Sequence, residues 1–269
     1  MTVESQIEQM AHARRECARK LGFLDAGIWL GQPVGFPLAR QLPPEELASV
    51  IGKSFITGGL VSHWRGKTVS AQDGNLALQA ALPSFPNDTY AVWTGLPLNP
   101  AEPGPLPGQG DLPEGVRGVR VFPKSHNYPL AGWVIGSLCD WLVEHRLPLF
   151  IWHVELDWPS LHALAGKFPQ LKVIVETQTQ KILYHTRPLF ALMRECRNVL
   201  VEISNFVGVR LIEYAVEQFG AERLIFGSFQ PISDPLVPIG MVIDAEISDS
   251  EKALIASGNL RRLIEEVQP

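Results

Sequence analysis

Three ionisable side chains stand where two consecutive apolar segments end. His153 and Glu155 close the segment LPLFIWHVEL, and Glu176 lies near the end of LKVIVET. Imidazole titrates near neutrality and can act as a general base, and a carboxylate beside it can orient the ring or exchange protons with it. We therefore predict His153, Glu176 and Glu155 as catalytic residues. The alternatives are a histidine satisfied by its neighbours and a solvent-exposed Glu155.

A second set of side chains is expected to form a pocket around these three. Each member lies at or just beyond the end of an apolar segment: Trp29, His63, Trp93, His126 and Phe229. The aromatic members favour a flat or apolar ligand held by a few polar groups. They could equally fill space, since protein interiors tolerate few voids. The two histidines could equally be ordinary polar residues of loops.

The segments that must position these residues are short, apolar and rich in β-branched and aromatic residues. Eight of them are typical of strands buried on both faces, as in a parallel sheet: residues 23–31, 59–64, 90–97, 116–123, 147–156, 171–177, 198–204 and 223–228. Segments with helical periodicity alternate with them. We predict an α/β fold, a single (β/α)8 TIM barrel over residues 23–269, with its active site at the carboxyl ends of the strands.

Residues 1–22 precede the first predicted strand and are charged throughout. Ile7, Met10 and Ala11 fall near one face of a helix, which predicts an extra N-terminal helix rather than a signal peptide. Because an exposed apolar stripe is unfavourable, we expect this helix to pack over the amino-terminal end of the barrel or in a subunit interface.

Residues 96–115, LPLNPAEPGPLPGQGDLPEG, are dense in proline and glycine and predict a loop. The loop follows the third predicted strand, on the side where barrel enzymes place their active sites. A long loop there can serve as a lid or a specificity loop, and a surface insertion without a role is the alternative.

Composition limits the partners of the chain. Its 269 residues, 46% of them apolar, suit one domain with a large core, and the net charge of −5 with scattered Lys and Arg gives no basic face for nucleic acid. Three widely spaced cysteines disfavour disulfides, and no apolar run approaches the roughly 20 residues of a membrane span. We expect a soluble cytoplasmic protein that binds a small molecule in the barrel mouth and can form a homo-oligomer.

The ends of the predicted strands resemble those of the amidohydrolase-related family, a compact branch of the metal-dependent amidohydrolase superfamily of TIM barrels. In that family the first strand reads Asp-x-His-x-His-x-Gly, two later strands end in His, the last reads Gly-Ser-Asp-x-Pro, and a closing helix carries Ile-x-x-x-Asn-x-x-x-Leu. The segments LDAGIWLG, LPLFIWHVE, LKVIVET, RLIFGSFQP and SDSEKALIASGNLRRLI follow that order here. The likeness covers nearly the whole chain from residue 23.

Most metal ligands of the family are replaced. Gly27 and Trp29 stand at the HxH pair, Thr177 and Phe229 stand at two further ligand positions, and His153 alone is retained. A catalytic zinc normally has about three protein ligands. We therefore predict no bound metal and no cofactor.

Two further expectations concern the direction of side chains. Since side chains alternate along a strand, Asp25, Gly27 and Trp29 are expected to point into the barrel. By the same alternation, Ile151 and His153 are expected to point inward on a later strand.

Three functions follow as hypotheses. The first is a hydrolase, implied by the resemblance, that acts by metal-independent acid–base chemistry on a small carboxylate, lactone or amide. The second is a non-catalytic barrel, or pseudoenzyme, that binds a small molecule or partners an active subunit. The third is a metal hydrolase with relocated ligands, such as His63, His126, His153 and Glu176. A mouth plugged by aromatic side chains would favour the second.

Overall fold

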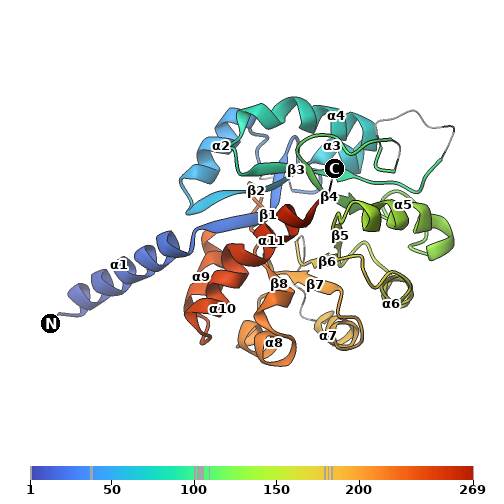
Figure 1. Cartoon of the computed structure of the whole chain (residues 1–269). Coiled ribbons are helices and arrows are strands. Elements are labelled where there is room, and N and C mark those ends of the chain that lie inside the picture. Colours follow the sequence, from blue (N-terminus) through green and yellow to red (C-terminus); the bar gives the residue numbers. More distant parts are fainter. Residues whose placement is uncertain are drawn as a thin grey trace.

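Eight parallel strands hydrogen-bond in chain order in the computed structural model, which describes residues 2–36, 39–99, 101, 106–108, 110–178, 180, 182 and 184–268. Ala26 N donates to Phe226 O at 3.0 Å, which joins the first strand to the chain that follows the eighth. Helices surround the ring of strands (Figure 1). The predicted (β/α)8 TIM barrel with an N-terminal helix is confirmed.

The strands are short, and the helices between them vary in length. The strands are β1 (Phe23–Leu30), β2 (Ile56–His63), β3 (Thr89–Thr94), β4 (Val116–Val121), β5 (Leu149–Trp152), β6 (Val173–Glu176), β7 (Val199–Glu202) and β8 (Leu224–Ile225). The helices are α1 (Val3–Leu21), α2 (Pro44–Gly52), α3 (Trp64–Thr68), α4 (Ala71–Ala81), α5 (Gly132–Glu144), α6 (Trp158–Lys167), α7 (Thr186–Glu195), α8 (Leu211–Phe219), α9 (Leu236–Asp244), α10 (Asp249–Ala253) and α11 (Asn259–Glu266).

Three buried clusters divide the interior. The largest lies between the strands and the surrounding helices. A second fills the lower barrel with side chains from seven of the strands and from α11: Leu24, Ala26, Leu60, Val92, Phe150, Ile174, Leu200, Ile225, Leu260, Leu263 and Ile264. The third is aromatic and lies at the carboxyl ends of the strands. Helix α11 therefore closes the barrel end opposite the mouth.

Asn259 attaches α11 to the barrel. Its Nδ2 donates to Ala221 O and to Leu224 O, both at 2.8 Å, and the side chain is fully buried. These two carbonyls lie at the start of β8, where a buried acceptor without a partner would be costly. The Ile-x-x-x-Asn-x-x-x-Leu pattern thus has a structural role in closing the barrel.

Strand β1 departs from strict alternation. Its pairing with β2 shifts in mid-strand. Leu24 and Ala26 belong to the interior cluster, so Asp25 between them faces away from it, whereas Trp29 joins the aromatic cluster at the mouth. The expectation that Asp25, Gly27 and Trp29 all point into the barrel is therefore wrong, because an irregularity changes which residues face inward.

Helix α1 forms where it is predicted but extends away from the barrel (Figure 1). Ile7 and Met10 are 60% and 66% exposed, and among its described residues only Ala18 is buried. An ion pair from Arg14 to Asp244 links it to α9. The expected packing over the barrel end holds only near the end of the helix, and a subunit interface along its outer part stays a prediction.

The loop at 96–115 lies partly outside the described residues, which omit 100, 102–105 and 109. Leu106 within it is buried, and Gln79 Nε2 donates to Glu114 O at 3.0 Å near its end. A lid role for this loop stays a prediction. Across the described chain, no helix combines the length and the hydrophobicity needed to cross a bilayer.

Candidate functional site

Five aromatic side chains fill the carboxyl-terminal mouth of the barrel. Four come from or directly follow β1, β2, β4 and β5, and the fifth lies four residues beyond β8; each is at most 2% exposed: Trp29, Trp64, Phe122, Trp152 and Phe229. The ring centroids of Trp29 lie 4.8 Å from Trp64 and 5.1 Å from Trp152, in tilted arrangements typical of packed aromatic pairs. The predicted pocket residues Trp29 and Phe229 therefore do meet, in a packed layer.

A buried ion pair lies directly beneath this layer. Arg120 Nε donates to Glu176 Oε2 at 2.8 Å and its Nη2 donates to Oε1 at 2.6 Å, with both side chains at most 1% exposed. The guanidinium also lies 4.7 Å from the centre of the Trp29 ring. Burial raises the pKa of Glu176 and the Arg120 charge opposes that rise. The two-point pairing occupies both carboxylate oxygens, so neither is free to accept a proton from a substrate.

Gln178 connects the ion pair to the aromatic layer. Its Nε2 donates to Glu176 Oε1 at 2.8 Å, and its Oε1 accepts from the indole nitrogens of Trp29 at 2.7 Å and Trp152 at 3.2 Å. Sequence reasoning missed this residue because the family pattern places a metal ligand at Thr177, and it gives no role to the residue after it. Its spacing of two from Glu176 was the available signal, since alternate residues of a strand share a side.

The residues present do not fit the metal that the family resemblance implies. A Cβ added at Gly27 would lie 2.7 Å from Gln178 Nε2 and 3.3 Å from Phe229 N, so a side chain at 27 would have to displace the Gln178 amide from its hydrogen bonds. Among the described residues, no group of three or more His, Cys, Asp or Glu side chains could hold a metal ion. The volume that a ligand at 27 would need is taken by Gln178.

His153 is buried, and one of its ring nitrogens lacks a partner. Its Nδ1 lies 3.1 Å from Glu176 O, and because a carbonyl can only accept, Nδ1 carries the proton. Nε2 is buried with no partner among the described residues. Burial lowers the pKa of His153 to about 4. The ring is therefore neutral near pH 7 and keeps a free basic nitrogen.

The position of His153 differs from the predicted one. Phe150 lies in the interior cluster and Trp152 in the mouth cluster, whereas Ile151 packs on the helix side of the sheet. His153 follows directly and meets the ring of His185, at the start of α7, with 5.0 Å between centroids. The expectation that Ile151 and His153 point into the barrel is wrong, since alternation on β5 places Phe150 and Trp152 inside.

Glu155 and His126 both contact Lys67 of α3. Glu155, from the segment after β5, also contacts Ser125 in the loop after β4, and His126 lies in that loop. Glu155 accepts from Ser125 N at 2.9 Å and pairs with Lys67 Nζ at 3.1 Å, while His126 Nε2 lies 3.1 Å from Lys67 O. Burial alone would raise the pKa of Glu155, but the Ser125 hydrogen bonds and Lys67 lower it overall. These bonds engage Glu155 away from His153.

The two remaining predicted residues lie outside the mouth cluster. His63 Nδ1 accepts from Arg65 N at 3.1 Å, and burial lowers the pKa of His63 to about 4. It lines a cavity of about 250 Å³ with Gly31, whose positive φ and missing side chain give the imidazole room. Trp93 lies in the cluster between strands and helices.

Two further buried carboxylates hold backbone near strand ends: Glu202, which sequence reasoning missed, and Asp25, for which it predicted only a direction. Glu202 accepts from Ser204 N at 2.6 Å and Thr177 N at 3.1 Å, and burial together with nearby Glu176 raises its pKa to about 8. Asp25 accepts from Ser228 N at 2.9 Å, and burial raises its pKa. Both sit inside predicted strands, where their backbone partners are not visible from the sequence.

Comparison with known proteins places this geometry in context. The sequence model of a family described as amidohydrolase matches residues 113–265. No curated protein matches the chain. An uncharacterized TIM-barrel protein from Bordetella bronchiseptica is 15% identical with a TM-score of 0.62, over 97% of this chain and 92% of that one.

Two decarboxylases have the same fold. A 5-carboxyvanillate decarboxylase from Novosphingobium aromaticivorans, solved with bound manganese, is 13% identical with a TM-score of 0.68, over 91% of this chain and 98% of that chain. A 2,6-dihydroxybenzoate decarboxylase from Rhizobium is 12% identical with a TM-score of 0.67 and the same coverage. At these identities the likeness shows the barrel fold and no particular reaction.

Replacing Arg120 by methionine should lower the free energy of unfolding by ~3–5 kcal/mol, because it leaves the Glu176 carboxylate buried without its partner. The double variant R120M/E176Q should recover most of the loss, since no buried charge remains. Urea denaturation of both variants measures this. A cost for R120M below ~1 kcal/mol, or no recovery in the double variant, would show that the pair does not hold the site.

Acid should destabilise the protein through His153. The unfolded chain protonates this histidine near pH 6.5 while the folded state does so only near pH 4, so the free energy of unfolding falls as pH drops through this window. His153 contributes up to ~1.4 kcal/mol per pH unit, the value for one proton, and His63, whose folded pKa is also lowered to about 4, adds to the slope in the same direction. Urea denaturation at several pH values in this window measures how steeply the free energy of unfolding depends on pH. H153Q should lose the ~1.4 kcal/mol per pH unit that one proton contributes, whereas H12Q, an exposed control on α1, should keep the native slope. Equal slopes in the two variants would refute the role given to His153.

Proposed function

This chain belongs to the amidohydrolase family, and from that premise we propose that it is a non-catalytic member whose barrel centre is packed with side chains. The observation that carries the proposal is the filled mouth. Five aromatic rings from around the barrel are buried there. A family whose relatives include carboxylate-acting enzymes needs an open mouth for substrate, and in this chain that space is occupied.

The donor chemistry supports the same proposal. At the positions that resemble the family's ligands, Gly27, Trp29, Thr177 and Phe229 offer no side chain suited to a transition metal. Histidine at 27 would also have to displace Gln178, which bonds two indoles and a carboxylate.

The ion pair between Arg120 and Glu176 inside the barrel also supports a non-catalytic role. Glu176 lies beneath the mouth layer, and both of its oxygens accept from Arg120. A general acid or base must be able to exchange its proton with substrate. We therefore propose that Glu176 stabilises the packing around it and does not act as a catalytic residue.

A second candidate function rests on His153. Its neutral ring and partnerless Nε2 provide the base that metal-independent hydrolysis of a small carboxylate, lactone or amide would require. Its position on the outer side of β5, against His185, separates it from the mouth cluster. We therefore rank this reaction below the non-catalytic role.

The non-catalytic role leaves two forms, a small-molecule binder and a partner subunit. The exposed Ile7 and Met10 of α1 support contact with another subunit, including a second copy of the chain. The composition supports a cytoplasmic location without nucleic-acid or membrane partners. These assignments belong to the proposal.

Opening the mouth tests the proposal. Trp64→Ala should cost ~3–5 kcal/mol of stability and leave an apolar cavity that binds indole, so indole should raise the Tm of W64A. It should not raise the Tm of the native protein, nor of W133A, a control that removes a tryptophan 84% exposed. Hydrolysis or CO₂ release from benzoates, lactones or amides should stay at background in all three.

Two results would contradict the proposal. One is turnover of any of these compounds by the native protein that W64A abolishes. The other is a rise in the Tm of the native protein with indole or benzoate as large as that of W64A, because it would mean that the mouth already has room for a flat ligand.

A further inference from the structure

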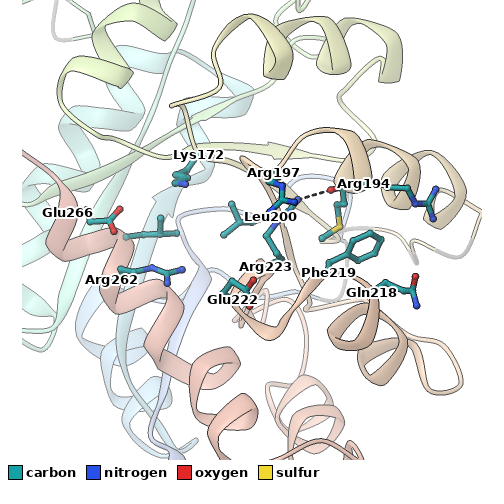
Figure 2. Close-up of a pocket in the computed structure, with 12 residues that line it drawn as sticks. Lys172, Arg194, Arg197, Leu200, Gln218, Phe219, Glu222, Arg223, Arg262 and Glu266 are labelled. Carbon is teal, nitrogen blue, oxygen red and sulfur yellow. Dashed lines mark hydrogen bonds between the residues drawn. The ribbon is translucent and has the colours of Figure 1, made fainter.

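A cavity of about 660 Å³ lies at the end of the barrel opposite the mouth. Its lining comes from the starts of β6, β7 and β8, from the ends of α7 and α8, and from α11 (Figure 2). That volume falls in the range of small-molecule sites. Nothing in the mouth cluster contributes to it.

Cationic side chains dominate this lining. Five line the cavity, Lys172, Arg194, Arg197, Arg223 and Arg262, against two carboxylates, Glu222 and Glu266. The chain as a whole carries a net charge of −5, so the cavity concentrates charge of the opposite sign. In the described part of the chain, no ion pair joins any of the five to a carboxylate.

Arg223 differs from the other four because it is only 9% exposed and its donors are used within the fold. Its Nε donates to Val199 O at 2.7 Å and its Nη2 to Cys196 O at 2.9 Å and Met193 O at 3.2 Å. Two of these carbonyls belong to the last turn and the C-cap of α7, where a cation is favourable, and the third opens β7. Since Arg223 already satisfies that end, the remaining cations are not needed for it.

The other cations converge from separate elements. Figure 2 shows Arg262 reaching from α11 toward the strands, with Lys172 and Arg197 on the neighbouring segments before β6 and β7. Leu200 and Leu263, both part of the interior cluster, form an apolar floor between them. The cavity thus offers several cations without an ion-pair partner among the described residues, next to an apolar surface that can pack against the carbon atoms of a ligand.

We infer that this cavity binds a small organic polyanion with two or more phosphate or carboxylate groups, held by Lys172, Arg197 and Arg262. Guanidinium groups bind both kinds of anion through two parallel hydrogen bonds. A polyanion would also relieve the repulsion among the clustered cations. The inference goes beyond the proposed function, because the site is at the opposite end of the barrel and does not depend on the packed mouth.

Calorimetric titration of the native full-length chain with pyrophosphate and with citrate tests the inference, against acetate and against NaCl of matched ionic strength. At least one polyanion should bind, and its affinity should fall as salt is raised. The double variant R197E/R262E should bind at least ten-fold more weakly. The control R15E/R187E makes the same change in net charge at exposed arginines outside this cavity and should stay within two-fold of the native affinity.

Comparison of the two probes identifies whether phosphate or carboxylate groups are preferred. No binding of either beyond the effect of NaCl would overturn the inference. An equal loss in both double variants would also overturn it, because the attraction would then reflect net charge. A loss only in R15E/R187E would assign binding to a different cavity, which Arg15 lines. Turnover at the mouth would refute the proposed function and leave this site unaffected.

Discussion

The buried ion pair between Arg120 and Glu176 is the contact on which the closed mouth depends. Two charges removed from water are tolerated only when their geometry is good and their remaining donors and acceptors are satisfied. Here Ala26 O, Ser62 Oγ and Gln178 complete the set. The carboxylate in turn orients Gln178, so that a single amide oxygen can accept from two indoles.

This dependence links the polar centre to the aromatic layer. With Gln178 fixed, the indole nitrogens of Trp29 and Trp152 are satisfied, and their rings can pack against each other and against Phe229, while the indole nitrogen of Trp64 in the same layer has no partner among the described residues. A half-satisfied network would be worse than an apolar core. The centre that a metal and its ligands would occupy in a relative is therefore a connected packing unit.

The sequence was sufficient for the barrel but not for the network. Eight apolar segments alternating with helical ones have few arrangements other than a (β/α)8 barrel, and Trp29, Phe229 and Glu176 were correctly expected near one end of it. Arg120 cannot be singled out from the sequence, because the segment VRGVRV holds two arginines, neither has a visible partner, and Glu176 is 56 residues away from Arg120. Such pairs are created by barrel closure rather than by local pattern.

The orientation of His153 and the cationic cavity show the same limit. Alternation counted from Ile151 predicts that His153 points inward, but β5 presents Phe150 and Trp152 to the interior, and a shift of one residue reverses the direction of every side chain. Lys172, Arg197 and Arg262 are scattered in the sequence and gather only where three strand starts meet α11. Composition therefore gives the net charge of the chain but does not predict that these cationic side chains cluster in one cavity.

We propose that side-chain packing has taken the volume of the family's metal site. Elemental analysis of the native protein after equilibrium dialysis with micromolar zinc or manganese tests this most directly. Less than ~0.1 metal ion per chain is expected, since the donors needed to replace the ion's hydration shell are absent from the ligand positions. About one ion per chain, lost in His153→Ala, would contradict it.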